Sequence, residues 1–153
     1  MSQDDNLIRT ANRELTIARR FAAPAALVFE AWTNPDLLTR WMCPNDFSVV
    51  SAQIEPRVGG AWRVRMRSPS GEDMWHDGIY EEFTPPSRLV FTHIWSGAHP
   101  NPGLKTLVTI DFTDQGDSTT MTFHQALFTS QEDCDDHGRG WSEAFDHLAE
   151  ALR

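Results

Sequence analysis

The chain has 153 residues, with 22 acidic and 13 basic side chains, a formal net charge of −9 and a pI near 5.0. This length fits one domain with a core of its own, and the negative charge disfavours nucleic acid as a partner because phosphate groups would be repelled. The two cysteines, Cys43 and Cys134, lie far apart and lack CxxC spacing, so neither a disulfide framework nor a zinc knuckle is indicated.

The first dozen residues are polar and lack the apolar core of a signal peptide. No later stretch reaches the ~18 consecutive apolar residues of a membrane span. We therefore expect a cytoplasmic protein with a disordered N-terminus over residues 1–12 and a single domain over residues 13–153.

The first predicted elements are one strand and two short helices. Leu15, Ile17 and Phe21 alternate with more polar residues, which predicts a strand over 14–21. Pro24 is placed to open a helix, and the Asn34-Pro35 pair ends it. Asn34 can then cap a second short helix that runs through Trp41. Two helices at this point mean that the next strand is not reached by a hairpin.

From Phe47 onward, period-two alternation predicts six further strands. The clearest case places Trp62, Val64 and Met66 on one face and three arginines on the other. The inward faces of the later strands are given by His76, Gly78 and Tyr80, by Leu89, Phe91, His93 and Trp95, by Val108, Ile110 and Phe112, and by Met121, Phe123 and Gln125.

The last quarter of the chain predicts an amphipathic helix from about Ser130 to Leu152, with Trp141, Phe145 and Leu148 on its apolar face. The spacing of Thr129 and Glu132 is that of a capping box. The concave face of the antiparallel sheet is the large apolar surface available to this helix. The prediction is an α+β fold in which a curved seven-stranded antiparallel sheet grips the C-terminal helix and encloses a cavity.

Four segments carry a family resemblance. They are FAAPAALVFEAWTNPDLLTRW at 21–41, PRVGGAWR at 56–63, GIYEEFTPPSRLVFT at 78–92, and MTFHQALF followed by GRGWSEAFDHLAEAL at 121–152. In order and spacing the chain resembles the START-like, or SRPBCC (Bet v 1-like), superfamily, and within it the bacterial branch related to the activator of heat shock protein 90 ATPase. The resemblance implies the helix-grip fold. It leaves function broad, because members include binding proteins, cyclases and other enzymes, and a chaperone activator.

Candidate site residues are polar or aromatic side chains on the predicted inner faces. His76, Tyr80, His93 and Gln125 interrupt apolar faces, and such groups either satisfy one another within the core or face a wet cavity. Large apolar side chains would form the walls of that cavity. The predicted ligand-binding set is Trp62, Met66, His76, Tyr80, Phe91, His93, Trp95, Gln125 and Trp141, with His93 as the leading candidate for direct ligand contact.

No catalytic residues can be assigned, because the sequence has no nucleophile elbow, P-loop or dinucleotide-binding fingerprint. The six histidines form no HxH or HExxH motif, so no metal and no cofactor is expected.

Three functional hypotheses remain open. The first is binding of a small, largely apolar molecule, aromatic or lipid-like. The second is an enzyme of the cyclase, dehydratase or hydrolase type that uses a pocket histidine, His76 or His93, as general acid/base near Tyr80. The third is a chaperone-associated interaction module. A homodimer and a chaperone are further partner hypotheses.

Overall fold

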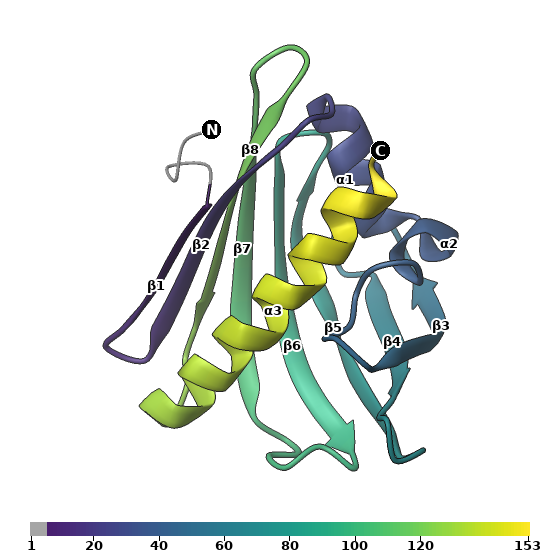
Figure 1. The fold of residues 1–153 in the computed structure, drawn as a ribbon, viewed down its shortest axis with the longest axis vertical. Helices are drawn as coiled ribbons and strands as arrows, with labels where there is room; N and C mark the ends of the chain where they lie inside the picture. The colour runs from purple at the N-terminus through teal and green to yellow at the C-terminus, as the bar shows by residue number, and fades with distance from the viewer. Residues whose placement is uncertain (1–5) are drawn as a thin grey trace.

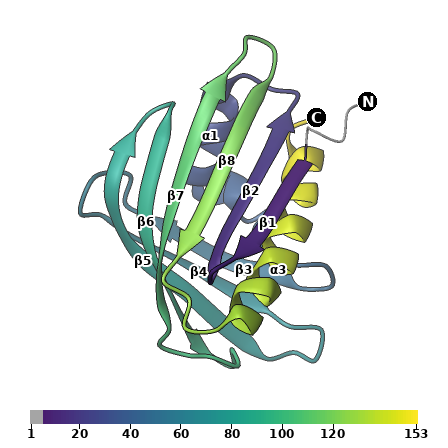
Figure 2. The same ribbon diagram turned by 90° about the vertical axis from the view of Figure 1, so that its left-hand side faces the viewer.

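The computed structural model describes residues 6–153, which form one eight-stranded antiparallel sheet and three helices. The order of strands across the sheet is β1-β2-β8-β7-β6-β5-β4-β3. Helix α3 runs diagonally across one face of this sheet (Figure 1). After a quarter turn, β4 and β5 slant strongly relative to β7 and β8, which shows the curvature of the sheet (Figure 2). The predicted helix-grip fold is confirmed.

The strands are β1 (Asn6–Ala11), β2 (Glu14–Phe21), β3 (Ser48–Ile54), β4 (Ala61–Arg67), β5 (Asp73–Thr84), β6 (Arg88–Gly97), β7 (Lys105–Asp114) and β8 (Thr119–Ala126). The helices are α1 (Ala25–Thr33), α2 (Pro35–Leu38) and α3 (Gln131–Ala151).

The sheet has one strand more than the seven expected, and the additional strand is β1. The expectation of a disordered segment over 1–12 is therefore wrong for residues 6–11, while residues 1–5 lie outside the described part of the chain. Asn12 and Arg13 have φ of 55° and 60°, so the two residues make the tight reversal of a two-residue hairpin. The backbone N–H of Arg13 also donates to Gln131 Oε1 at 2.9 Å, which ties this hairpin to the start of α3.

The helix boundaries follow from local chemistry. Asn34 Oδ1 accepts from the backbone N–H of Asp36 and Leu37, as expected for the cap of α2. At α3 the cap is Ser130 and not Thr129, because the Ser130 side chain accepts from the backbone N–H of Asp133. Gly138 lets α3 approach β1 and β2 closely, since a Cβ there would lie 3.2 Å from Leu15 Cδ1.

The core lies between the sheet and the helices. Its densest part is aromatic: Trp32 of α1 packs against Trp41 with ring centroids 4.7 Å apart, and Phe145 of α3 packs against Phe123 of β8 at 5.4 Å. On the other face of the sheet, Arg65 and Arg67 pair with Asp73, so the predicted arginine row is solvated and balanced by acidic residues. No helix within residues 6–153 is both long enough and apolar enough to cross a membrane.

Candidate functional site

A cavity of about 240 Å³ lies between the first half of α3 and the strands β4 to β6. Its volume is a little under the ~300 Å³ at which ligand pockets usually begin, so it suits a molecule of one or two rings. The lining side chains are mostly apolar. They are Met42, Cys43, Pro44, Phe47, Met66, Met74, Trp95, Pro100, Trp141 and Ala144, together with Gly140 and the polar residues His76, His99, Asp133, Asp136 and His137.

Helix α3 contributes one stripe of residues to the cavity. Asp133, His137, Trp141 and Ala144 are spaced by three or four positions, so their side chains lie one above another on the same face. Gly140 adds an open stretch to this face, because a Cβ there would meet only Pro44 Cγ at 3.7 Å. The side of α3 that faces the cavity thus contributes two carboxylates, Asp133 and Asp136, together with an imidazole, an indole and two small residues.

The strands place two matched pairs of residues opposite this helix. Met66 of β4 lies directly across from Met74 of β5, and His76 of β5 lies directly across from Trp95 of β6. The rings of His76 and Trp95 are stacked, with centroids 4.6 Å apart and an interplanar angle of 18°. Cross-strand pairing therefore holds one face of the His76 ring against an indole.

His76 and His93 form a buried imidazole pair. Their Nδ1 and Nε2 atoms, respectively, are 3.0 Å apart, and both side chains are at most 2 % exposed. The outer nitrogens, His76 Nε2 and His93 Nδ1, have no hydrogen-bond partner among the described residues. His76 lines the cavity, whereas His93 lies behind it. Buried nitrogens of this kind are usually satisfied, so His76 Nε2 is a candidate contact for a ligand.

His137, in contrast, uses both of its ring nitrogens within the protein. Trp95 Nε1–H donates to His137 Nε2 at 2.8 Å, so this nitrogen carries no proton in the neutral ring. His137 Nδ1–H then donates to the carbonyl oxygen of Asp133 at 2.8 Å. His137 thus fixes the Trp95 ring to α3.

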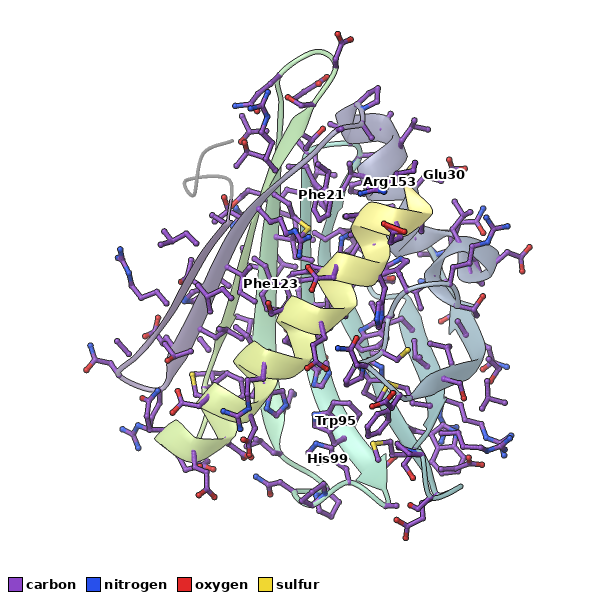
Figure 3. The ribbon with its side chains drawn as sticks, viewed as in Figure 1. Phe21, Glu30, Trp95, His99, Phe123 and Arg153 are labelled. Atoms are coloured by element: carbon purple, nitrogen blue, oxygen red, sulfur yellow. The ribbon has the colours of Figure 1, made fainter. Side chains whose placement is uncertain are left out.

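His99 covers the cavity from the β6–β7 loop. Its ring stacks on Trp95 at 4.1 Å with an interplanar angle of 6°, and the two residues lie side by side near the end of β6 (Figure 3). The backbone N–H of Asn101 donates to His99 Nδ1 at 3.0 Å, and the Asn101 side chain donates to Asp133. The loop is therefore attached to α3 beside the cavity.

All four histidines around Trp95 are neutral at neutral pH. Burial lowers the pKa of His76 to about 3, with a further contribution from the positive charges that His137 and His99 would carry. Burial likewise holds the pKa of His93 well below its usual value and lowers the pKa of His99 to about 4. The pKa of His137 is also lowered, chiefly by burial. The imidazoles thus offer hydrogen bonds without charge.

Gln125 holds Trp141 in place from the opposite side. Trp141 Nε1–H donates to Gln125 Oε1 at 2.9 Å, and Gln125 Nε2–H donates to Thr106 Oγ1 at 2.8 Å. Gln125 is fully buried and does not line the cavity. Its position accounts for a glutamine on an apolar strand face, because the amide satisfies two buried polar side chains.

The predicted site residues fall into two groups. Met66, His76, Trp95 and Trp141 line the cavity, and the other five, Trp62, Tyr80, Phe91, His93 and Gln125, lie in the packed core beside it. Trp62 Nε1–H donates to the carbonyl oxygen of Thr92 at 3.2 Å, and the Phe91 ring contacts Trp62 with centroids 5.2 Å apart. A ligand role for any member of the set stays a prediction.

Several lining residues were missed by the sequence analysis. His137 could have been found, because it lies one helical turn before Trp141 on the predicted apolar face. Met74 also alternates in phase with His76, but alternation alone did not place it, because Gly78 could have marked a bulge. Met42, Phe47 and His99 lie outside helices and strands, where no periodic pattern predicts which way a side chain points. Within residues 6–153, no cluster of three or more histidine, cysteine or acidic side chains could hold a metal ion.

The fold recurs in solved structures of similar size. A protein from Rhodobacter sphaeroides aligns with a TM-score of 0.80 at 24 % identity, covering 95 % of this chain and 97 % of the other. The AHSA1 protein from Silicibacter pomeroyi aligns with a TM-score of 0.80 at 22 % identity, covering 91 % and 96 %. CalU16 from Micromonospora echinospora aligns with a TM-score of 0.69 at 24 % identity, covering 96 % and 84 %. At this identity the likeness establishes the fold alone.

A comparison with curated proteins found no significant match. The family model described as Activator of Hsp90 ATPase homolog 1-like protein, in contrast, matches residues 22–153. This range begins directly after β2, runs through α3 and includes every residue of the cavity wall. The chain therefore belongs to the family of Activator of Hsp90 ATPase homolog 1-like proteins.

Proposed function

We propose that this protein binds a small, largely apolar molecule, with an aromatic ring or a short lipid-like chain, in the cavity between β4–β6 and α3. Membership of the family supports a ligand-binding or interaction domain in general terms. The finer proposal is carried by one observation: a mostly apolar cavity of about 240 Å³ whose lining includes His76, a side chain with a buried Nε2 that has no hydrogen-bond partner among the described residues. This combination is typical of small-molecule sites, where few polar groups orient an apolar ligand.

The protonation of the imidazoles supports binding over acid–base catalysis. A general acid or base works best when its pKa is near the operating pH, and the pKa of His76 is about 3. His93, which was the other candidate base, is enclosed behind His76 and has a pKa well below its usual value. Neutral imidazoles that hydrogen-bond without ionising suit the recognition of an uncharged molecule.

The test uses a substitution that fills the cavity without weakening the helix. Gly140→Leu would project a branched side chain from α3 into the cavity, and replacing a helical glycine raises helix propensity. Gly140→Ala is the matched control, because it gains the same propensity and leaves most of the space. Toluene is a suitable probe, and its affinity is measured by quenching of tryptophan fluorescence.

We expect Gly140→Leu to weaken toluene binding by about tenfold or more, since the ligand would have to displace a packed side chain. Gly140→Ala should bind within about twofold of the unsubstituted protein. Equal affinities in all three proteins would contradict the proposal. Native mass spectrometry of the protein purified from its own host would then identify the class of any ligand that it retains.

A further inference from the structure

The orientation of the four histidines determines which hydrogen bonds remain free for a ligand. His137 is saturated, because Nε2 accepts from Trp95 and Nδ1–H donates to Asp133. His99 accepts at Nδ1 from Asn101, so in the neutral ring its proton is on Nε2, and the ring can offer a donor only. His76 remains: this residue lines the cavity, and its buried Nε2 has no hydrogen-bond partner among the described residues.

The hydrogen bond between the two rings does not by itself decide whether His76 Nε2 is a hydrogen-bond donor or an acceptor. Two neutral imidazoles share two protons among four nitrogens, and one of these protons lies in the 3.0 Å bond between His76 Nδ1 and His93 Nε2. If His76 is the donor in that bond, its Nε2 is a bare acceptor and His93 Nδ1 carries the second proton. If His93 is the donor, His76 Nε2 carries a proton and His93 Nδ1 is bare.

Both arrangements contain the same hydrogen bond between the two rings. Each leaves the same two outer nitrogens without a partner among residues 6–153. The two arrangements differ in which ring holds the central proton and in which outer nitrogen carries the second proton. The charge of the pair does not change, so the switch avoids the cost of a buried imidazolium.

The surroundings keep this pair uncharged and rigid. The His76 ring is stacked on Trp95, and the His93 ring lies 5.8 Å from the ring of Trp62. Within the described residues, no acidic side chain forms a hydrogen bond or an ion pair with either ring. The oxygen of a bound ligand would therefore contact a nitrogen that is fixed in position but can be either a hydrogen-bond donor or an acceptor.

Resting on the proposed function, we infer that the ligand carries a hydroxyl or carbonyl group that is hydrogen-bonded to His76 Nε2. We further infer that the tautomer of the His76–His93 pair depends on this group: Nε2 is a bare acceptor for a hydroxyl and carries a proton that it donates to a carbonyl oxygen. The ligand class is then a neutral, ring-containing molecule with one oxygen function, and its hydroxyl and carbonyl forms bind in the same place.

Two pairs of probes of matched shape test this inference. Phenol differs from toluene by a hydroxyl in place of a methyl group, and acetophenone differs from cumene by a carbonyl oxygen in place of a methyl group. Within each pair, the ratio of the two dissociation constants is compared between the unsubstituted protein and His76→Phe, which keeps a flat ring beside Trp95 and removes Nε2. His124→Phe, on the outer face of β8, is the control.

We expect His76→Phe to reduce the preference for the oxygen-bearing probe by about fivefold or more in both pairs, which corresponds to one buried hydrogen bond. His124→Phe should leave both ratios unchanged. Isotope-edited NMR of the imidazole nitrogens then reports the tautomer. The proton of His76 should be on Nδ1 in the phenol complex and on Nε2 in the acetophenone complex.

Two results would overturn the inference while leaving the proposed function in place. One is that toluene and cumene bind but neither ratio changes in His76→Phe. The other is that His76 has the same tautomer in both complexes. If none of the four probes binds to the unsubstituted protein, the proposed function fails as well, so the two failures are distinguishable.

Discussion

The two halves of α3 face the same sheet but have different environments. In the second half, Phe145 packs among the rings of Trp32, Trp41 and Phe123, and both Phe145 and Leu148 are fully buried. The first half places Asp133, His137 and Gly140 around a cavity of about 240 Å³.

The difference arises from what the sheet and the connections supply at each end. Opposite the second half, α1 closes the core and the strands contribute phenylalanine and branched aliphatic side chains. Opposite the first half, β4 and β5 contribute flexible methionines and an imidazole, and the cover is formed by two irregular segments, 42–47 and the β6–β7 loop. One helix can therefore stabilise the fold with one half and leave room for a ligand with the other.

The largest expected effect is on stability, and it comes from truncating a buried side chain beside the second half of α3 and comparing this with a truncation beside the cavity. Phe145→Ala should lower the free energy of unfolding by about 3–5 kcal/mol, because it opens a void in close-packed surroundings. Met74→Ala should cost only about 2 kcal/mol, since this side chain already borders the cavity. Urea denaturation measures both. Equal losses would mean that the two ends are packed alike.

The next largest effect on stability is expected from the hydrogen bond between Trp141 and Gln125. Gln125→Leu should lower the free energy of unfolding by about 1–3 kcal/mol, because the Trp141 N–H and the Thr106 hydroxyl both lose a buried partner. Tryptophan emission should also shift as the Trp141 ring moves. Gln53→Leu, at an exposed position of β3, is the control and should leave stability and emission nearly unchanged. A Gln125 variant as stable as the control would refute the assigned role.

Acid should weaken the cavity end through its histidines. A pKa lowered in the folded state means that the unfolded state binds more protons, so stability is complete above pH 6.5 and falls as the pH drops towards the folded values of about 3 for His76 and about 4 for His99. The lowered pKa of Asp73 adds a further loss of stability at pH values below its ordinary pKa of 3.8.

Urea midpoints between pH 6.5 and pH 4 measure this dependence. His76→Phe should make the loss of stability shallower over that range, because one proton-binding difference is removed. An unchanged slope in His76→Phe would show that the imidazole is accessible to protons in the folded state.

The smallest effect concerns the start of α3, beside the cavity. Ser130→Ala should cost about 1 kcal/mol, because the backbone N–H of Asp133 loses its acceptor. Thr129→Ala should be nearly neutral, since Thr129 is exposed and lies one residue before the cap. Thermal denaturation of the two variants distinguishes these positions, and the opposite order would restore the cap expected from the sequence.

The fold was predictable because its main signals are periodic. Alternation in strands assigned the inner faces that carry His76, Tyr80 and Phe91, and the helical stripe through Trp141 assigned the face of α3. Strand β1 was not predictable in this way, because its large apolar residues, Leu7 and Ile8, are adjacent and both exposed. Its hairpin also places Arg13 at a positive φ, where sequence patterns lead one to expect glycine or asparagine.

The site was predictable only in part. Alternation predicts which face of the sheet a side chain lies on, but not whether that side chain reaches the cavity or lies in the packed core beside it. His93 and Gln125 point to the same side of the sheet as His76, yet they lie in the packed core while His76 reaches the cavity. Whether a side chain reaches the cavity depends on which side chains of α3 stand opposite, and on loops such as the one that carries His99. Neither follows from the period of a single strand.

Methionine methyl NMR tests the central claim, that the first half of α3 encloses a binding cavity while the second half is filled. Met42, Met66 and Met74 line the cavity, whereas Met121, fully buried in β8, does not. On titration with toluene, the methyl signals of Met42, Met66 and Met74 should shift together and saturate, and the signal of Met121 should stay in place. A shift of Met121 as large as theirs, or no shift in any of the three, would contradict the account.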